Sequence, residues 1–407
     1  MKIFILSLIA LVFVINIFMS ILDLKSRKRV IAKSVSDVYD KDEYTNWRNY
    51  QKDSTTLGIV SGIVSLIITA VLFYFNIFSK IYYWTTDLTN ILIFQVYLFI
   101  LVISLISVFF DTVISYYDTF ILEEKYGMNK TSKKLFIKDT IVKFLLKVVF
   151  FGLLLYVLNI IYVSFENPFI FFITAFSSIA VLVLLMPYLQ PIFSRIFNKA
   201  TSLEEGSLKD KINAYANKMN FPVENIYVID ASKRSSRSNA YFSGYGKKRR
   251  IVLYDTLISE FSEEEIVAIL AHEVGHAKHK DILKRIPMSL FVIGFFLISL
   301  YIIASNKDIS LAFGFTESNF LFSIMVFIEI MPLTIIIINT ITNWFSRKME
   351  YAADKYSVTT YSKEYLVSAL KKLSRKNLSN LAPHPITVVI NYTHPPLDKR
   401  IEAIENI

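Results

Sequence analysis

The chain has 407 residues, of which 54% are hydrophobic and 19% are charged, and its formal net charge is +10. It has no cysteine, which excludes disulfides and thiolate metal sites, so any metal must be bound by histidine and carboxylate. The long uncharged stretches indicate a membrane protein, and lysines and arginines flank these stretches, which argues against a nucleic-acid-binding module.

Seven segments are apolar and long enough to cross a bilayer as helices, which takes about 20 residues each. They are Ile3–Ile21, Leu57–Phe78, Ile91–Ile114, Ile141–Val163, Phe169–Phe193, Ile286–Ala304 and Leu321–Trp344. The first differs from a signal peptide, because its apolar run is longer than usual and no small-residue cleavage site follows it. We expect it to remain attached.

The connections between these segments differ in charge. Lysines and arginines are concentrated after the first, third and fifth segments, whereas the alternate connections contain few. By the positive-inside rule, the N-terminus is expected outside the cell or in a lumen, and the C-terminus in the cytoplasm.

Polar stretches in the first half of the chain predict further local structure. The connection Asp23–Thr56 contains a predicted helix at Tyr44–Tyr50, which is either part of a substrate entry or a plain loop. The connection Phe120–Asp139 predicts two short helices, with Gly127 ending the first.

The sizeable soluble stretch is Ser194–Arg285. It predicts a helix at Leu208–Met219 and then three strands, rich in β-branched and aromatic residues, that suggest a small antiparallel sheet. The strands are Asn225–Ile229, Ala240–Phe242 and Arg250–Tyr254. We expect Asn239–Gly244 to form an edge that binds an extended substrate by main-chain hydrogen bonds, with ordinary sheet interior as the alternative.

The clearest chemical signal lies in Phe261–Asp281. Ser262 and Glu265 form a capping box that predicts the start of a helix. On that helix, the histidines of the HEVGH sequence stand one turn apart on the same face, so both can bind one ion, with a glutamate beside them. These residues are His272, Glu273 and His276. The alternative is a pair of surface histidines, so a third ligand must decide.

Candidates for that third ligand follow the last two predicted spans, which return the chain to the same side of the membrane. Glu350 and Asp354 share one face of a predicted helix, so one carboxylate can complete the site while the other orients a ligand imidazole. His279 is disfavoured as a ligand, because the three-histidine pattern HExxHxxGxxH requires a glycine there and a histidine at Ile282.

The sequence alone leaves the roles of two further sets of residues open. His394 or Arg400, in the C-terminal THPPLDKR stretch, could donate to a developing oxyanion, or that stretch could be a packing tail. Glu329, within the seventh span, lines an internal cavity or makes a helix-pairing contact.

Together these motifs resemble the zinc-dependent CAAX prenyl protease family, the type I CAAX endopeptidases with HExxH and ExxxD helices. The likeness covers almost the whole chain in family order, through FILEEKYGMNKT, SKRSSRSNAYFSG, RIVLYDTLI, HEVGH, NWFSRKMEYAAD and THPPLDKR. One departure is Arg237, where the family pattern RSxHSN has histidine.

The resemblance implies a role for each residue of the metal site. His272, His276 and Glu350 would bind one zinc ion, Glu273 would be the general base, and Asp354 would support a ligand imidazole.

It also implies the substrate contacts. Asn239, Ala240 and Tyr241 would hold the substrate backbone, and His394 and Arg400 would contact substrate or stabilise the oxyanion.

The implied fold is a multi-span α-helical membrane protein whose seven helices enclose a water-filled chamber, with a small α+β gluzincin-type zinc peptidase domain. Four parts are expected. They are 1–193, an N-terminal membrane region; 194–285, a soluble segment with the HExxH helix; 286–344, a transmembrane hairpin; and 345–407, a C-terminal catalytic segment.

Members of this family remove the last three residues of isoprenylated CAAX proteins, and some clear proteins stalled in translocation. The resemblance therefore implies a membrane zinc endopeptidase that acts on prenylated or membrane-associated proteins from the cytoplasmic side. The membrane would be the plasma membrane in a bacterium or the endoplasmic reticulum in a eukaryote. The alternative is a quality-control peptidase acting on unprenylated proteins. A transporter is disfavoured, because no pair of Gly/Pro-broken spans occurs in corresponding halves.

Overall fold

The fold is that of a computed structural model, which describes every residue except 166, 222 and 244–249. Six helices in this described part are long and apolar enough to cross a membrane. They are α1 (Lys2–Ser26), α2 (Lys41–Tyr74), α4 (Leu92–Tyr117, continued by a π-helical turn at Asp118–Glu123), α5 with α6 (Lys133–Leu146 and Gly152–Ser164, joined by a π-helical turn at Lys147–Phe151), α7 (Pro168–Phe197) and α11 (Asp281–Ser305).

Two further helices, α13 (Phe320–Ile330) and α14 (Pro332–Thr360), are together long and apolar enough to be a bent seventh span, and they meet at an angle of 56°. Pro332 is the first residue of α14, and a proline cannot donate the backbone hydrogen bond that would continue the preceding helix. The seven predicted spans therefore all correspond to helices, and the predicted multi-span helical fold is confirmed.

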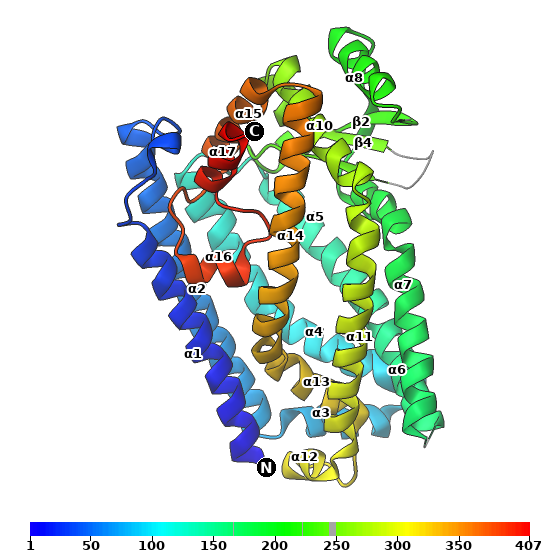
Figure 1. The fold of residues 1–407 in the computed structure, drawn as a ribbon. Helices are drawn as coiled ribbons and strands as arrows, with labels where there is room; N and C mark the ends of the chain where they lie inside the picture. The colour runs from blue at the N-terminus through cyan, green and yellow to red at the C-terminus, as the bar shows by residue number, and fades with distance from the viewer. Residues whose placement is uncertain (166, 222, 244–249) are drawn as a thin grey trace.

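The second span begins earlier than its apolar residues suggest. A capping box between Asp40 and Glu43 starts α2, so the predicted helix at Tyr44–Tyr50 forms the first turns of a continuous 34-residue helix. Short helices α3 (Ile77–Leu88) and α12 (Lys307–Ala312) lie near the N-terminus, at the lower end of the molecule in Figure 1.

The sheet has four strands in the order β1-β2-β4-β3, which are β1 (Ala200–Ser202), β2 (Asn225–Ile229), β4 (Arg250–Tyr254) and β3 (Ala240–Ser243). β2 and β4 are parallel and the other pairs are antiparallel, so the prediction of an antiparallel sheet is wrong for that central pair. The reason is that β4 lies between β2 and β3, so that β2 and β3 do not pair with each other. β3 does lie at an edge, as predicted, although Gly244 is outside the described residues.

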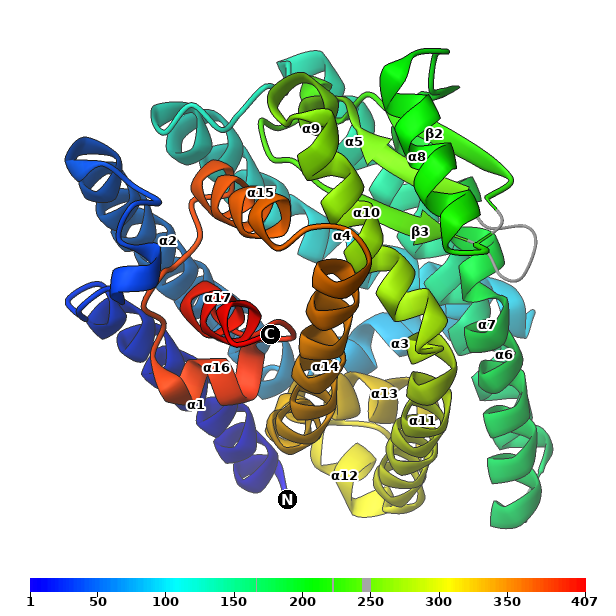
Figure 2. The same ribbon diagram turned by 45° about the horizontal axis from the view of Figure 1, so that its top comes forward.

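Most of the remaining elements gather with the sheet and the end of α14 at the end of the spans opposite the N-terminus, while the short helix at Pro385–Asn391 lies about halfway along α14 (Figures 1 and 2). They are α8 (Ser207–Lys218), α9 (Asp255–Glu260), α10 (Glu263–Lys278), α15 (Lys363–Lys376), α16 (Pro385–Asn391), α17 (Leu397–Glu405) and 3-10 turns at Lys33–Val35 and Ala231–Lys233.

The helices α10 and α14 cross very closely at Gly275. A Cβ atom at this position would lie 3.0 Å from the Cα atom of Ala353 and 3.0 Å from the Cβ atom of Tyr356. Glycine therefore allows the HExxH helix to approach the backbone of α14, which carries the two candidate carboxylates.

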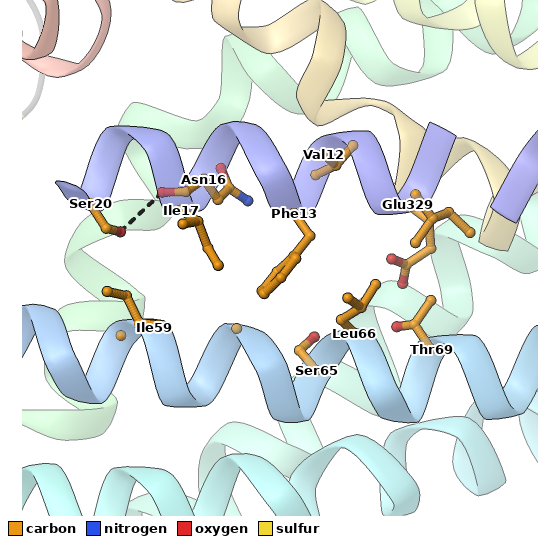
Figure 3. A pocket seen from close by; sticks show the side chains of 13 residues that line it. Val12, Phe13, Asn16, Ile17, Ser20, Ile59, Ser65, Leu66, Thr69 and Glu329 are labelled. Carbon is orange, nitrogen blue, oxygen red and sulfur yellow. Dashed lines mark hydrogen bonds between the residues drawn. The ribbon is translucent and has the colours of Figure 1, made fainter. Parts of the chain in front are cut away.

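Glu329 lies on α13, one turn before the bend into α14. It lines a small pocket of about 130 Å³ between α1 and α2, where Figure 3 shows its carboxyl group beside Thr69 and Leu66. Both alternatives left open by the sequence therefore apply, because Glu329 lines a pocket and also hydrogen-bonds to Thr69 of the neighbouring helix α2.

Candidate metal centre

The capping box predicted at the start of α10 is present. The hydroxyl of Ser262 accepts from the backbone N–H of Glu265 at 3.2 Å, and the Glu265 carboxylate accepts from the N–H of Ser262 at 2.9 Å. That carboxylate also accepts from Ser368 at 2.6 Å and Lys372 at 2.7 Å, both on α15. The first turn of α10 is thereby fixed to its neighbour, which sets the orientation of the HExxH face.

His272, His276 and Glu350 form a group whose ligand atoms all lie within 4.8 Å of one another. The Nε2 atoms of the two histidines are 3.1 Å apart, and the Glu350 oxygens lie 3.4 Å from His272 Nε2 and 3.3 Å from His276 Nε2. Nitrogen and oxygen ligands about 2.1 Å from a tetrahedral zinc ion are about 3.4 Å from each other, so the spacing fits zinc.

The second nitrogen of each imidazole contacts a buried carboxylate. His272 Nδ1 lies 2.8 Å from Asp354 Oδ1, and His276 Nδ1 lies 2.9 Å from Asp281 Oδ2. Each carboxylate accepts a hydrogen bond from a protonated Nδ1. The lone pair of each Nε2 is then free to bind an ion placed between the two histidines and Glu350. The two Nε2 atoms are then both acceptors and cannot hydrogen-bond to each other, although they lie 3.1 Å apart. A cation between them would accept both lone pairs and account for this close approach.

The charges around the histidines favour positive charge at the same point. Burial disfavours a charged imidazole at His272, but the hydrogen bond with Asp354 and the nearby carboxylate of Glu350 outweigh it and raise the pKa of His272 to about 9. The Oε2 atom of Glu350 is buried and has no hydrogen-bond partner among the described residues, as expected for an oxygen reserved for a metal.

Glu273 lies between the two histidines in sequence and shares their electrostatic environment. Burial raises its pKa, while the charges of His272 and His276 act in the opposite direction. A carboxylate whose pKa is raised by burial is a better proton acceptor than a solvated one, which suits a general base.

Asp281 is a site residue that the sequence reasoning missed. Its side chain is buried, and it is the first residue of α11, directly after Lys280, which adopts a left-handed conformation with φ 58°. This turn points the carboxylate back to His276. The signal in the sequence is an acidic residue just past the end of the HExxH helix, but its contact depends on a turn that spacing does not reveal.

Arg400 and His394 occupy different positions in the site. Arg400 donates two hydrogen bonds to Asp354, at 2.8 Å from Nε and 2.6 Å from Nη2, and its side chain is only 11% exposed. His394 Nε2 lies 3.3 Å from Glu350, and its side chain is 61% exposed. Arg400 is therefore engaged in orienting Asp354, whereas His394 is accessible to a substrate.

The predicted substrate strand lies next to α10. Ala240 belongs to the same hydrophobic core as Ala271 and Val274 of the HExxH helix. On its inner side β3 pairs with β4, and within the described part of the chain no strand pairs with its outer side. The outer side can therefore accept an extended peptide near the candidate metal ligands.

Two other residues discussed from the sequence lie outside the ligand group. His279 packs edge-on to the ring of Tyr356, with ring centroids 5.9 Å apart. Arg237 contacts the Tyr50 hydroxyl at 3.1 Å and Glu123 at 3.3 Å, so it ties the chain before β3 to α2 and to the end of α4.

Comparisons with known proteins agree over nearly the full length. Residues 202–407 match Peptidase family M48, and residues 20–199 match the CAAX prenyl protease N-terminal region of five membrane helices. The chain is 32% identical to CAAX prenyl protease 1 of Saccharomyces cerevisiae, over 92% of this chain and 88% of that protein. It is 30% identical to the mouse CAAX prenyl protease 1 homolog, over 94% and 90% of the two chains. The crystal structure of S. mikatae Ste24p superposes with a TM-score of 0.93 at 30% identity and covers 99% of both chains.

Proposed function

We propose a substrate, a metal and a set of residue roles on the premise that this chain belongs to the CAAX prenyl protease 1 family, membrane-embedded peptidases of family M48. The proposed reaction is removal of the C-terminal tripeptide from isoprenylated CAAX proteins. The observation that carries it is the convergence of His272, His276 and Glu350 beside the edge strand β3, within a chain that matches such proteases over nearly its full length.

The proposed cofactor is one zinc ion per chain, held by His272, His276 and Glu350. The donor set of two imidazoles and one carboxylate, without cysteine, is typical of catalytic zinc. When bound, zinc supplies a Lewis acid that polarises the scissile carbonyl and lowers the pKa of a water molecule.

The chain's own residues supply the proton transfers. Glu273 takes a proton from the attacking water and returns it to the leaving amine. His394, the exposed donor beside Glu350, stabilises the oxyanion that develops on the scissile carbonyl. Arg400 stays on Asp354 and preserves the orientation of His272.

The proposed substrate position is along the outer edge of β3. The extended C-terminal residues of the substrate pair with the main chain at Ala240. Asn239 faces β4, where its carbonyl accepts from the N–H of Tyr254, and Tyr241 has the same orientation because main-chain groups alternate along a strand. Such pairing is independent of side chains, so the choice of prenylated proteins must come from recognition of the lipid group elsewhere in the membrane region.

The proposed orientation places this catalytic end in the cytoplasm. The basic connections follow the first, third and fifth spans, and the catalytic elements lie at the opposite end of the molecule from the N-terminus. Cytoplasmic access suits a substrate whose C-terminus is prenylated in that compartment.

The test is zinc content and cleavage of a farnesylated CAAX peptide by protein purified in detergent, beside Glu273→Gln. We expect one zinc per chain in both proteins and cleavage only in the wild type, because the glutamine cannot accept the proton. Zinc without cleavage of this peptide, but with cleavage of an unprenylated misfolded membrane protein, would reject the CAAX assignment in favour of quality control. Cleavage retained by Glu273→Gln would reject Glu273 as the base.

A further inference from the structure

A groove of about 740 Å³ lies beside the catalytic end, between the chain that follows α1, the middle of α14 and the chain around α16. Figure 1 shows α16 lying across the space between α1 and α14. Pro395 and Pro396, which directly follow His394, belong to its lining. The groove therefore adjoins the metal centre but does not include its ligands.

The charged side chains of this groove are mostly cationic. Four cations and one carboxylate line it, namely Arg29, Arg347, Lys348, Lys399 and Asp398. Lys399 is ion-paired with Glu402 at 2.7 Å, so three positive charges remain against one negative charge, and this excess attracts an anion.

Two of these cations are available to a ligand. Lys348 is exposed, with its Nζ atom 3.7 Å from the ring centroid of Trp344, and it forms no ion pair among the described residues. Arg29 is also exposed and uses Nη1 to donate to the carbonyl of Pro383. By contrast, Arg347 Nη1 donates to the carbonyls of Val388 and Tyr392, at 2.9 and 2.7 Å, which holds α16 in place.

Between the cations the groove is apolar and open. Val30 is 93% exposed and Val389 is 44% exposed, although both are large hydrophobic residues. Exposed tryptophan with lysine and arginine near the end of a span is typical of the headgroup level of a bilayer. The groove thus offers cationic donors and apolar contacts side by side, at the depth where a phospholipid has both kinds of group.

We propose that this groove binds an anionic phospholipid, with its phosphate between Arg29 and Lys348 and an acyl chain along Val30 and Val389. Basic pockets between spans bind anionic headgroups in this way. The lipid would lie against α16 and against Pro395 and Pro396, so it would stabilise the position of the segment that carries His394. This proposal goes beyond the peptidase function, which can hold without it.

The experiment measures thermal unfolding of the purified protein in neutral detergent while phosphatidylglycerol or phosphatidylcholine is added. Phosphatidylglycerol should raise the unfolding temperature of the wild type well above the effect of phosphatidylcholine, because a ligand that binds the folded state stabilises it. Loss of both available cations in Arg29→Gln/Lys348→Gln should raise the concentration needed for half of this shift about 30-fold, at about fivefold for each charge.

The matched control is Lys133→Gln/Lys134→Gln, which removes two exposed lysines at the start of α5 that do not line the groove. It should keep the wild-type response. A further variant, Val30→Asp, adds a negative charge at a position with almost no packing to lose and should also weaken the response.

Three outcomes would overturn the proposal. They are a wild-type protein that responds equally to both lipids, a groove variant with the same phosphatidylglycerol response as the lysine control, and an equal shift produced by inorganic phosphate. The last would show an anion site without lipid contacts. Because the readout is unfolding rather than hydrolysis, none of these outcomes bears on the peptidase assignment.

Discussion

Replacing Gly275 with alanine tests whether the close crossing of α10 and α14 sets the geometry of the metal site. The added Cβ atom would lie 3.0 Å from the Cα atom of Ala353 and 3.2 Å from its carbonyl oxygen. Carbon atoms in contact prefer about 3.5–4.0 Å, so α14 must retreat by about 0.5–1 Å.

We expect Gly275→Ala to weaken metal binding more than it lowers the free energy of unfolding. Overpacking costs about 1–3 kcal/mol, but alanine in place of glycine inside a helix recovers about 1 kcal/mol. The free energy of unfolding should therefore fall by about 0–2 kcal/mol. Glu350 lies one turn from Ala353 on the same helix, and ligand positions tolerate displacements of only about 0.5 Å. Zinc affinity should fall at least tenfold.

The assay is competition for zinc between purified protein and a chromophoric chelator, with thermal unfolding measured on the same samples. Gly58→Ala is the matched control, since it makes the same substitution inside α2, where a Cβ atom meets nothing within 4 Å. If Gly275→Ala binds zinc as tightly as this control, the crossing does not position Glu350 and the reasoning is refuted.

Three further outcomes are expected at the metal centre. Asp281→Asn should lower zinc affinity about 10- to 100-fold in the chelator competition, because it removes the charge that orients His276. Unchanged affinity would show that Asp281 is not part of the site. Arg400→Gln should lower the free energy of unfolding by about 3–5 kcal/mol, because it leaves the buried charge of Asp354 without its cation, whereas His394→Gln should lower kcat and leave thermal unfolding unchanged. If His394→Gln lowered the stability and Arg400→Gln lowered only kcat, the roles assigned to the two residues would have to be exchanged. Removing the metal with a chelator should abolish hydrolysis and lower the unfolding temperature, both restored by zinc, and activity that survives complete removal would exclude a metallopeptidase.

How far the sequence predicts this structure depends on the range of the interactions involved. Helical periodicity determines which side chains share a face within one turn, so the pairing of His272 with His276 and of Glu350 with Asp354 can be predicted from spacing. Span counting then shows that both helices emerge on the same side of the membrane. The capping box of α10 is likewise a local pattern, and it is present as predicted.

Other features depend on contacts that no local pattern encodes. The alternation of residues in β2 and β4 shows that both are strands but not that they are parallel neighbours, since that pairing joins segments that are distant in sequence. The contact of Asp281 depends on the left-handed turn at Lys280. The pairing of Arg400 with Asp354 joins two helices, α17 and α14, whose relative position comes from tertiary packing.

The division of the metal ligands between α10 and α14 has a consequence for biosynthesis. Two ligands precede the spans formed by α11 and by α13 with α14, and the third, Glu350, lies towards the C-terminal end of α14. A nascent chain that has emerged only as far as α10 therefore carries His272, Glu273 and His276 but no complete ligand group. The third ligand arrives after the last two spans have inserted, so proteolytic competence is withheld until the enzyme itself has been fully threaded into its membrane.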